Sequence, residues 1–181
     1  MNEKRLTIGG IVVKTTVVHT LTYFIVGLIA FNLFNYTKQF AGPVLSSFMK
    51  QTNDPVVRAG VLFQPVRGIL FGIVFYLLRD VLFRQRNGWF IMWIMLAVIG
   101  IISTFGPAPG SIEGFIYTKL PFTGLWGGGA EVLTQALLLS ILTFYWVNHP
   151  EKKWLNWVLG SLCLIALILP ALGLLANQAT Q

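Results

Sequence analysis

The sequence predicts an all-α membrane protein, a single bundle of five transmembrane helices with a Gly/Pro-rich loop between the third and the fourth. Of the 181 residues, 55% are hydrophobic and only 10% are charged, whereas an average soluble domain carries about 25% charged residues. The mean hydropathy is +0.72. The apolar residues also come in runs long enough to cross a bilayer. Because these runs take up most of the chain, we expect one polytopic domain over residues 1–181.

The apolar runs predict where the helices cross the membrane. We expect the five spans at about residues 15–37, 62–83, 89–106, 130–148 and 154–176. Between Lys14 and Lys38 lie 23 uncharged residues, which as a helix reach about 34 Å, enough for the hydrocarbon core. This run is too long for the core of a signal peptide and shows no small-residue cleavage site, so we expect the first span to be retained.

The second and third spans are joined by a polar turn. Pro65 suits the first turn of the second helix, which contains Arg67. In that helix Asp80 and Arg84 are four residues apart, so they should lie on one face. The third span carries no charge and ends at a cluster of glycines and prolines, which break helices.

The last two spans are separated by a second polar turn. The fourth has Glu131 in its first turn and ends at the segment His149–Lys153. The fifth begins at Trp154 and carries no charge, and Pro170 should kink it.

The lysines and arginines that flank the spans predict the orientation, since cytoplasmic flanks carry an excess of them. With the N-terminus inside, the inner flanks hold eight (Lys4, Arg5, Lys14, Arg79, Arg84, Arg86, Lys152 and Lys153) and the outer ones four (Lys38, Lys50, Arg58 and Lys119). We therefore expect an integral protein of the plasma (inner) membrane with a cytoplasmic N-terminus and an outside C-terminus. Because the basic residues sit at the ends of apolar runs, the net charge of +7 does not indicate nucleic acid as a partner.

The segment from Phe105 to Gly129 is too apolar for an ordinary exposed loop. It holds seven glycines, three prolines and several aromatic residues, and connections of this length are usually functional or disordered. Non-helical backbone is tolerated at membrane depth where protein or a water-filled cavity surrounds it, so we expect a re-entrant or interfacial loop. The alternative is a folded cap on the outer face.

Two charged residues lie within or at the edge of apolar helices, Arg67 and Glu131. A charge near a helix centre costs roughly 2.5 to 3.5 kcal/mol on insertion scales, so such groups face the bundle interior and find partners. We therefore expect Arg67 and Glu131 to interact, either as a binding site for a polar or anionic group or as a fixed ion pair between two spans. Residues near this pair complete the predicted binding site, which comprises Arg67, Glu131, Gln135, Arg58, Glu113, Gly127 and Gly128.

Other chemistry finds little support in the sequence. There is one cysteine, Cys163, and two histidines, His19 and His149, that lack a neighbouring cysteine or acidic partner. We predict no metal site, no cofactor and no catalytic residues, because hydrolase, zinc-protease and nucleotide-binding motifs are all absent from the sequence. Gly68 and Gly72 form a GxxxG pattern, which permits close contact between helices.

These observations leave three classes of function. The first is a small polytopic protein that binds or transports a small or amphipathic, lipid-like or anionic molecule at its outer face. The second is a non-catalytic accessory subunit of a membrane complex. The third is an intramembrane enzyme that acts on lipid, with Glu131 or Glu113 as acid or base, although a second catalytic group is missing. The expected partners are membrane lipids, together with further copies of the chain or a larger membrane complex.

Overall fold

The computed structural model describes residues 6–43, 45–119 and 128–178. All regular elements in this part of the chain are helices, which confirms the predicted all-α class. The long helices are α1 (Ile8–Leu33), α4 (Gln64–Leu77), α6 (Gly88–Ala97), α8 (Gly128–Asn148) and α9 (Trp154–Gln178). The short ones are α2 (Tyr36–Phe40), α3 (Pro55–Arg58), η1 (Gly60–Phe63), α5 (Arg79–Leu82), the π-helical turn η2 (Val98–Ile102) and α7 (Ile112–Tyr117).

Helix α1 begins earlier than the charge pattern predicted. The hydroxyl of Thr7 accepts a hydrogen bond from the Gly10 amide at 3.2 Å and caps the helix, so Lys14 lies inside α1 rather than before it. At the other end α1 stops at Leu33, because Asn35 takes the left-handed conformation (φ 50°) and turns the chain into α2. The apolar run expected at 15–37 is therefore divided between two helices.

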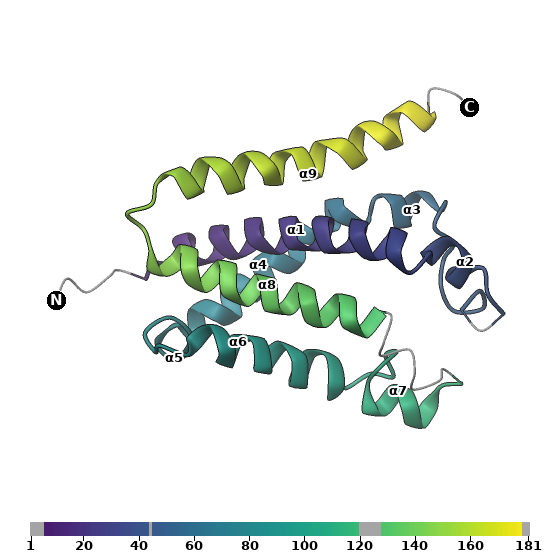
Figure 1. Ribbon diagram of the computed structural model, residues 1–181, viewed down its shortest axis with the longest axis horizontal. Helices are drawn as coiled ribbons and strands as arrows, with labels where there is room; N and C mark the ends of the chain where they lie inside the picture. Colours follow the sequence, from purple (N-terminus) through teal and green to yellow (C-terminus); the bar gives the residue numbers. More distant parts are fainter. Residues whose placement is uncertain (1–5, 44, 120–127, 179–181) are drawn as a thin grey trace.

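Helix α1 is the centre of the bundle and contacts α4, α8 and α9 (Figure 1). Both α4 and α8 run antiparallel to it. Gly27 of α1 faces Glu131 of α8, and further back along α1 the Lys14 ammonium donates to the Trp146 carbonyl at 2.9 Å. Because that carbonyl lies in the last turn of α8, where helix carbonyls lack partners within the helix, Lys14 satisfies one of them.

The contact between α1 and α4 depends on two glycines. A Cβ atom on Gly68 would lie 2.6 Å from the Thr16 Cα, and one on Gly72 would lie 2.7 Å from the Val12 Cα. These are distances that no side chain could occupy without moving a backbone. The prediction that the GxxxG pattern permits close helix packing is confirmed, and the partner is α1 of the same chain.

The chain reverses direction between α4 and α6. The predicted pair on one helix face is present, with Arg84 Nε 2.8 Å from Asp80 Oδ1. A Cβ on Gly88 would lie 1.9 Å from the Leu82 carbonyl oxygen, so only glycine permits this turn. Next to this turn, apolar side chains from α1, α4, α5, α6 and α8 form a buried cluster of Ile11, Phe75, Leu82, Phe83, Met92 and Val147.

Four helical segments of the described chain are long and apolar enough to cross a membrane. They are Ile8–Leu33, Gly60–Leu77, Gly129–Asn148 and Trp154–Ala176. The fifth apolar segment, Gly88–Ile102, is shorter, because the helix expected at 89–106 ends at Ile102. Its α6 part packs along α8, where the Trp93 indole donates to the Leu133 carbonyl at 3.2 Å. The structure is therefore that of an all-α membrane protein with four candidate spans.

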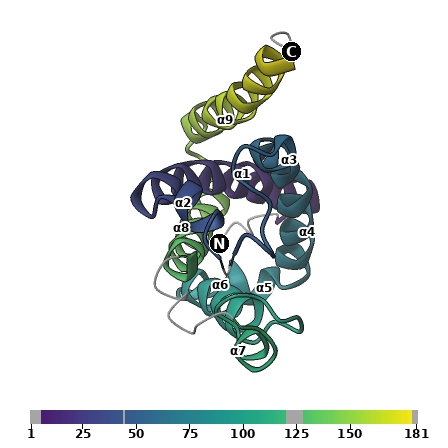
Figure 2. The same ribbon diagram turned by 90° about the vertical axis from the view of Figure 1, so that its right-hand side faces the viewer.

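The remaining elements lie at the edges of this bundle. Helix α9 packs against α1 and the α3–η1 segment, outside the group formed by α1, α4, α6 and α8 (Figure 2). The segment expected as a loop at 105–129 contains the short helix α7, and its residues 120–127 lie outside the described part of the chain.

Candidate functional site

Arg67 lies in the first turns of α4, and its side chain lines a cavity between the helices. Its Nη1 donates to the Gln64 Oε1 at 3.4 Å, and its guanidinium carbon lies 5.8 Å from the centre of the Phe71 ring. No ion pair joins it to an acidic side chain within the ranges that the structure describes. The contacts of the guanidinium with the Gln64 amide and the Phe71 ring are thus with neutral groups.

Gln64 connects Arg67 to His19 of α1. The Gln64 amide nitrogen donates to the Gly60 carbonyl at 2.9 Å, so its Oε1 is the atom that faces the other two side chains. The His19 Nε2 lies 3.1 Å from this oxygen and must therefore carry the hydrogen that it donates. Both Gln64 and His19 are buried, and the His19 ring meets the Phe71 ring edge-on at 5.0 Å between centroids.

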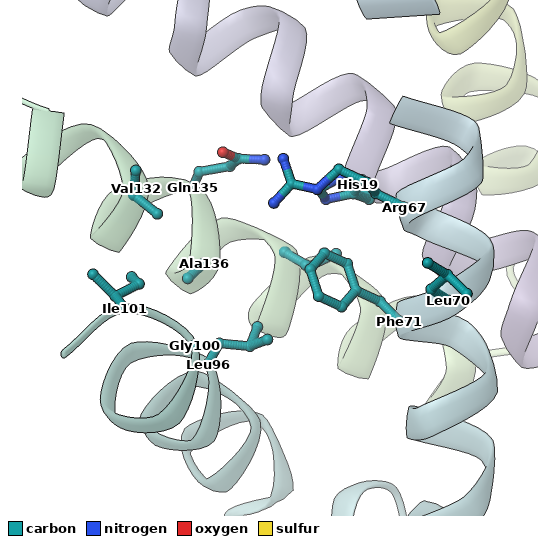
Figure 3. Close-up of a pocket in the computed structure, with 11 residues that line it drawn as sticks. His19, Arg67, Leu70, Phe71, Leu96, Gly100, Ile101, Val132, Gln135 and Ala136 are labelled. Carbon is teal, nitrogen blue, oxygen red and sulfur yellow. The ribbon is translucent and has the colours of Figure 1, made fainter. Parts of the chain in front are cut away.

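The cavity has a volume of about 330 Å³ and is lined by residues of five elements, α1, α4, α6, η2 and α8. Its polar groups are His19, Arg67 and Gln135, and Figure 3 shows the Gln135 side chain of α8 and the Arg67 guanidinium pointing toward each other. The rest of the lining is apolar: Leu70, Phe71, Leu96, Gly100, Ile101, Val132, Ala136 and Leu139. This composition, a mostly apolar hollow with a few converging polar groups, is typical of small-molecule sites.

The packing of Gly68 against α1 shows at which level along α1 the cavity lies. Gly68, next to Arg67, packs against Thr16, and His19 is one turn further along α1, near the middle of its length. Arg67 and His19 are therefore close to the midpoint of α1. Polar groups at such a depth are costly and mark binding sites or ion pathways in membrane proteins.

Glu131 lies in the first turn of α8 and is bound by another residue, Tyr36 of α2. The Tyr36 hydroxyl donates a hydrogen bond to the Glu131 Oε2, and the Glu131 Oε1 lies 3.6 Å from the position of a Cβ on Gly27. Burial raises the pKa of the Tyr36 hydroxyl, and the hydrogen bond to the carboxylate and its negative charge raise it further. The Tyr36 hydroxyl therefore keeps its proton, and remains the donor of this hydrogen bond, at every physiological pH.

The expected interaction between Arg67 and Glu131 is absent. Gly68, next to Arg67, packs against Thr16, whereas the Glu131 carboxylate faces Gly27, about three helical turns further along α1. Each side chain is hydrogen-bonded to a different residue instead, Arg67 to Gln64 and Glu131 to Tyr36. The prediction of a fixed ion pair between the second and fourth spans is wrong for this reason.

The other predicted site residues are dispersed. Gln135 lines the cavity, as its position one turn after Glu131 allows. Arg58 is exposed at the end of α3, and Glu113 lies in the first turn of α7; neither is among the residues that line the cavity. Gly128 begins α8, and Gly127 lies outside the described residues.

Sequence reasoning missed two members of these groups. The sequence indicated His19 only as a candidate metal ligand, yet it is 1% exposed and hydrogen-bonded to a glutamine 45 residues away. Tyr36 is separated from Glu131 by 95 residues. No periodicity within one helix connects positions so far apart, so only the spacing of Gln64 and Arg67, one helical turn apart, was a usable signal.

Taken together, the fold and the cavity define the class: an α-helical membrane protein with an arginine-containing polar site among its apolar helices. Within the described residues, no three His, Cys, Asp or Glu side chains lie close enough together to hold a metal ion. No protein-family model, no curated protein and no solved structure matches the chain.

Proposed function

We propose that the protein binds or transports a small amphipathic anion, whose negative group is held in the cavity by Arg67. The observation that carries this proposal is the unpaired guanidinium at membrane depth. An arginine in an apolar helix normally finds a counter-charge in the bundle, yet the nearest hydrogen-bonding group of Arg67 is the neutral Gln64 amide. A ligand carboxylate or phosphate would supply the missing negative charge, and its oxygen atoms suit the planar donors of arginine.

The cavity supports a ligand with both a polar and an apolar part. Gln135 faces Arg67 across the hollow and offers an amide that can donate to the same anionic group. The apolar side chains around them provide a surface for a hydrocarbon portion. The volume of about 330 Å³ is roughly twice that of a cavity of about 150 Å³ that holds benzene, so a headgroup with a short chain fits.

We further propose five crossings of the membrane, with the N-terminus cytoplasmic. Four segments have the length for this, and Gly88–Ile102 runs alongside α8 within the same bundle. At about 1.5 Å per residue this segment reaches only about 22 Å, against a hydrocarbon core of about 30 Å. The fifth crossing therefore needs residues that follow Ile102, and the Gly/Pro-rich segment after it would enter the membrane or lie at its interface.

The two alternative functions have less support. An accessory subunit could use a GxxxG pattern to bind a helix of another protein, but Gly68 and Gly72 are covered by α1 and offer no such surface. An enzyme that acts on lipid would need a carboxylate at the cavity, and neither Glu131 nor Glu113 lines it.

Isothermal titration of the protein in zwitterionic lipid nanodiscs tests the proposal, with empty nanodiscs as the blank. Octanoate and octyl phosphate should bind, while octanol, which lacks the charge, should bind much more weakly. Inorganic phosphate and acetate separate recognition of an amphipathic anion from recognition of any small anion. Preference between octanoate and octyl phosphate identifies the headgroup class.

Two matched variants locate the site. Arg67→Gln removes the guanidinium and should weaken binding by about tenfold to a hundredfold, as expected for loss of a charged hydrogen bond of about 1.5 to 3 kcal/mol. Arg58→Gln makes the same change at an exposed arginine outside the cavity and should leave binding unchanged. Equal affinities of the wild type and Arg67→Gln for both anions would refute the proposed site.

A further inference from the structure

The His19 ring has one nitrogen whose state the hydrogen-bond network leaves open. Its Nε2 donates to Gln64 and is occupied, whereas its Nδ1 is buried and has no hydrogen-bond partner among the described residues. In a neutral ring with the hydrogen on Nε2, the Nδ1 carries a lone pair. A proton can therefore be added at Nδ1 without breaking the bond to Gln64.

The charged and titratable groups around His19 can be named for each element packed on α1. Arg67 of α4 is the nearest charge and shares the Gln64 Oε1 with the ring. On α1 itself the Tyr23 ring lies 6.5 Å from the His19 ring between centroids, whereas the Lys14 ammonium is turned to the Trp146 carbonyl. On α8 the Glu131 carboxylate faces Gly27, about two helical turns along α1 from His19. Helix α9 carries one titratable side chain, the thiol of Cys163. Arg67 is thus the group that most strongly opposes a positive charge on the ring while the cavity is empty.

An anion bound at Arg67 would change the charge that surrounds the His19 ring. It neutralises the guanidinium and places a negative charge in the cavity that His19 also lines. In a medium of low dielectric constant, such a change of charge a few ångströms away alters protonation strongly. A buried imidazolium also needs an acceptor for its new N–H. Thr15, one turn earlier on the same face of α1, has a buried hydroxyl without a partner among the described residues.

We propose that binding of the anion at Arg67 is coupled to the uptake of one proton by His19 at Nδ1, so that anion and proton enter the site together. This inference rests on the proposed function, since it needs an anion in the cavity. The proton comes from water, and the Nδ1 lone pair forms the new N–H bond. The occupied site then has the same net charge as the empty one, which avoids a change of charge inside the membrane. By linkage, each ligand strengthens the binding of the other by the same factor.

The test uses octyl sulfate, an amphipathic anion whose headgroup does not titrate near neutral pH. The wild-type protein in nanodiscs is titrated with it in two buffers of different ionisation enthalpy, so that the difference in heat gives the protons taken up per anion. We expect up to one proton per octyl sulfate. In the pH range where each octyl sulfate takes up one full proton, we also expect the Kd to fall by up to tenfold for each unit by which the pH decreases.

Two histidine variants assign the proton. His19→Gln keeps a side-chain N–H for the Gln64 oxygen but cannot be protonated, so it should bind octyl sulfate without proton uptake and with a Kd independent of pH. His149→Gln alters the histidine that follows the end of α8, outside the cavity, and should behave as the wild type. Uptake that persists in His19→Gln would overturn the assignment.

A spectroscopic measurement covers the case in which His19→Gln does not fold. In the His149→Gln protein labelled with ¹⁵N-histidine, the Nδ1 signal of His19 should move from the unprotonated to the protonated range when octyl sulfate is added. A signal that stays in the unprotonated range with octyl sulfate bound would overturn the coupling alone. Absence of any binding of octyl sulfate, octanoate or octyl phosphate would overturn the proposed function and the coupling together.

Discussion

The tight contact between α4 and α1 predicts the effect of adding one methyl group at Gly68. In Gly68→Ala the new Cβ would lie 2.6 Å from the Thr16 Cα, and 3.2 Å from both the Thr16 Cβ and its carbonyl oxygen. The closest of these is a backbone atom, which cannot rotate away. Moving it to 3.4 Å, an ordinary contact distance, requires a shift of about 0.8 Å between the helices.

The expected loss of stability follows from two opposing terms. Overpacking of this kind typically costs about 1 to 3 kcal/mol, while alanine gains about 0.5 to 1 kcal/mol over glycine inside a helix. We expect the free energy of unfolding to fall by about 1 to 2 kcal/mol, which lowers the melting temperature by roughly 2 to 8 °C in a chain of this size. Because Gly68 is adjacent to Arg67, the shift should also weaken binding of octanoate.

Thermal unfolding followed by tryptophan fluorescence, with the protein in nanodiscs, measures this loss. Gly160→Ala on α9 is the matched control, since a Cβ there meets nothing within 4 Å. This variant should be as stable as the wild type or slightly more stable. If Gly68→Ala melts at or above the temperature of Gly160→Ala, the packing argument is refuted, and α4 and α1 do not meet as described.

Three further predictions concern the Tyr36–Glu131 contact and the topology. In a double-mutant cycle, Tyr36→Phe and Glu131→Gln should show an interaction energy of at least about 0.5 kcal/mol in thermal or chemical unfolding, and strict additivity would mean that the two side chains do not meet. Because the pKa of Tyr36 is raised in the folded protein, its contribution to stability should be fully present below about pH 10, the ordinary value for tyrosine, and be lost as the pH rises further. Tyr36→Phe should remove that part of the alkaline destabilisation, and an unchanged pH profile would contradict the assignment. In a Cys163→Ser background, Asn87→Cys and Lys119→Cys should react with an impermeant maleimide from opposite sides of the membrane, whereas labelling from one side would show that Gly88–Ile102 does not cross.

The site could be predicted only in part. Arg67 was identifiable because a charge in an apolar helix stands out, and Gln135 because it follows Glu131 by one turn. The partner of Arg67 was predicted wrongly. The cost of burying a charge favours pairing Arg67 with Glu131, but it does not indicate at which level along α1 each of the two residues lies. His19 and Tyr36 gave no usable signal, because their partners Gln64 and Glu131 are distant in the chain.

By itself, the sequence determined that the protein is an all-α membrane protein and that polar turns separate its apolar runs. It also determined that Gly68 and Gly72 permit a close contact between helices. These features are local, since hydropathy, helix-breaking residues and residue spacing act within one segment of chain. The tertiary structure decided which helix the glycines meet, how far along α1 each neighbour lies, and therefore which polar groups share a cavity. Depth and register depend on the packing of side chains from several helices at once, and a periodicity read along one helix contains no information about either.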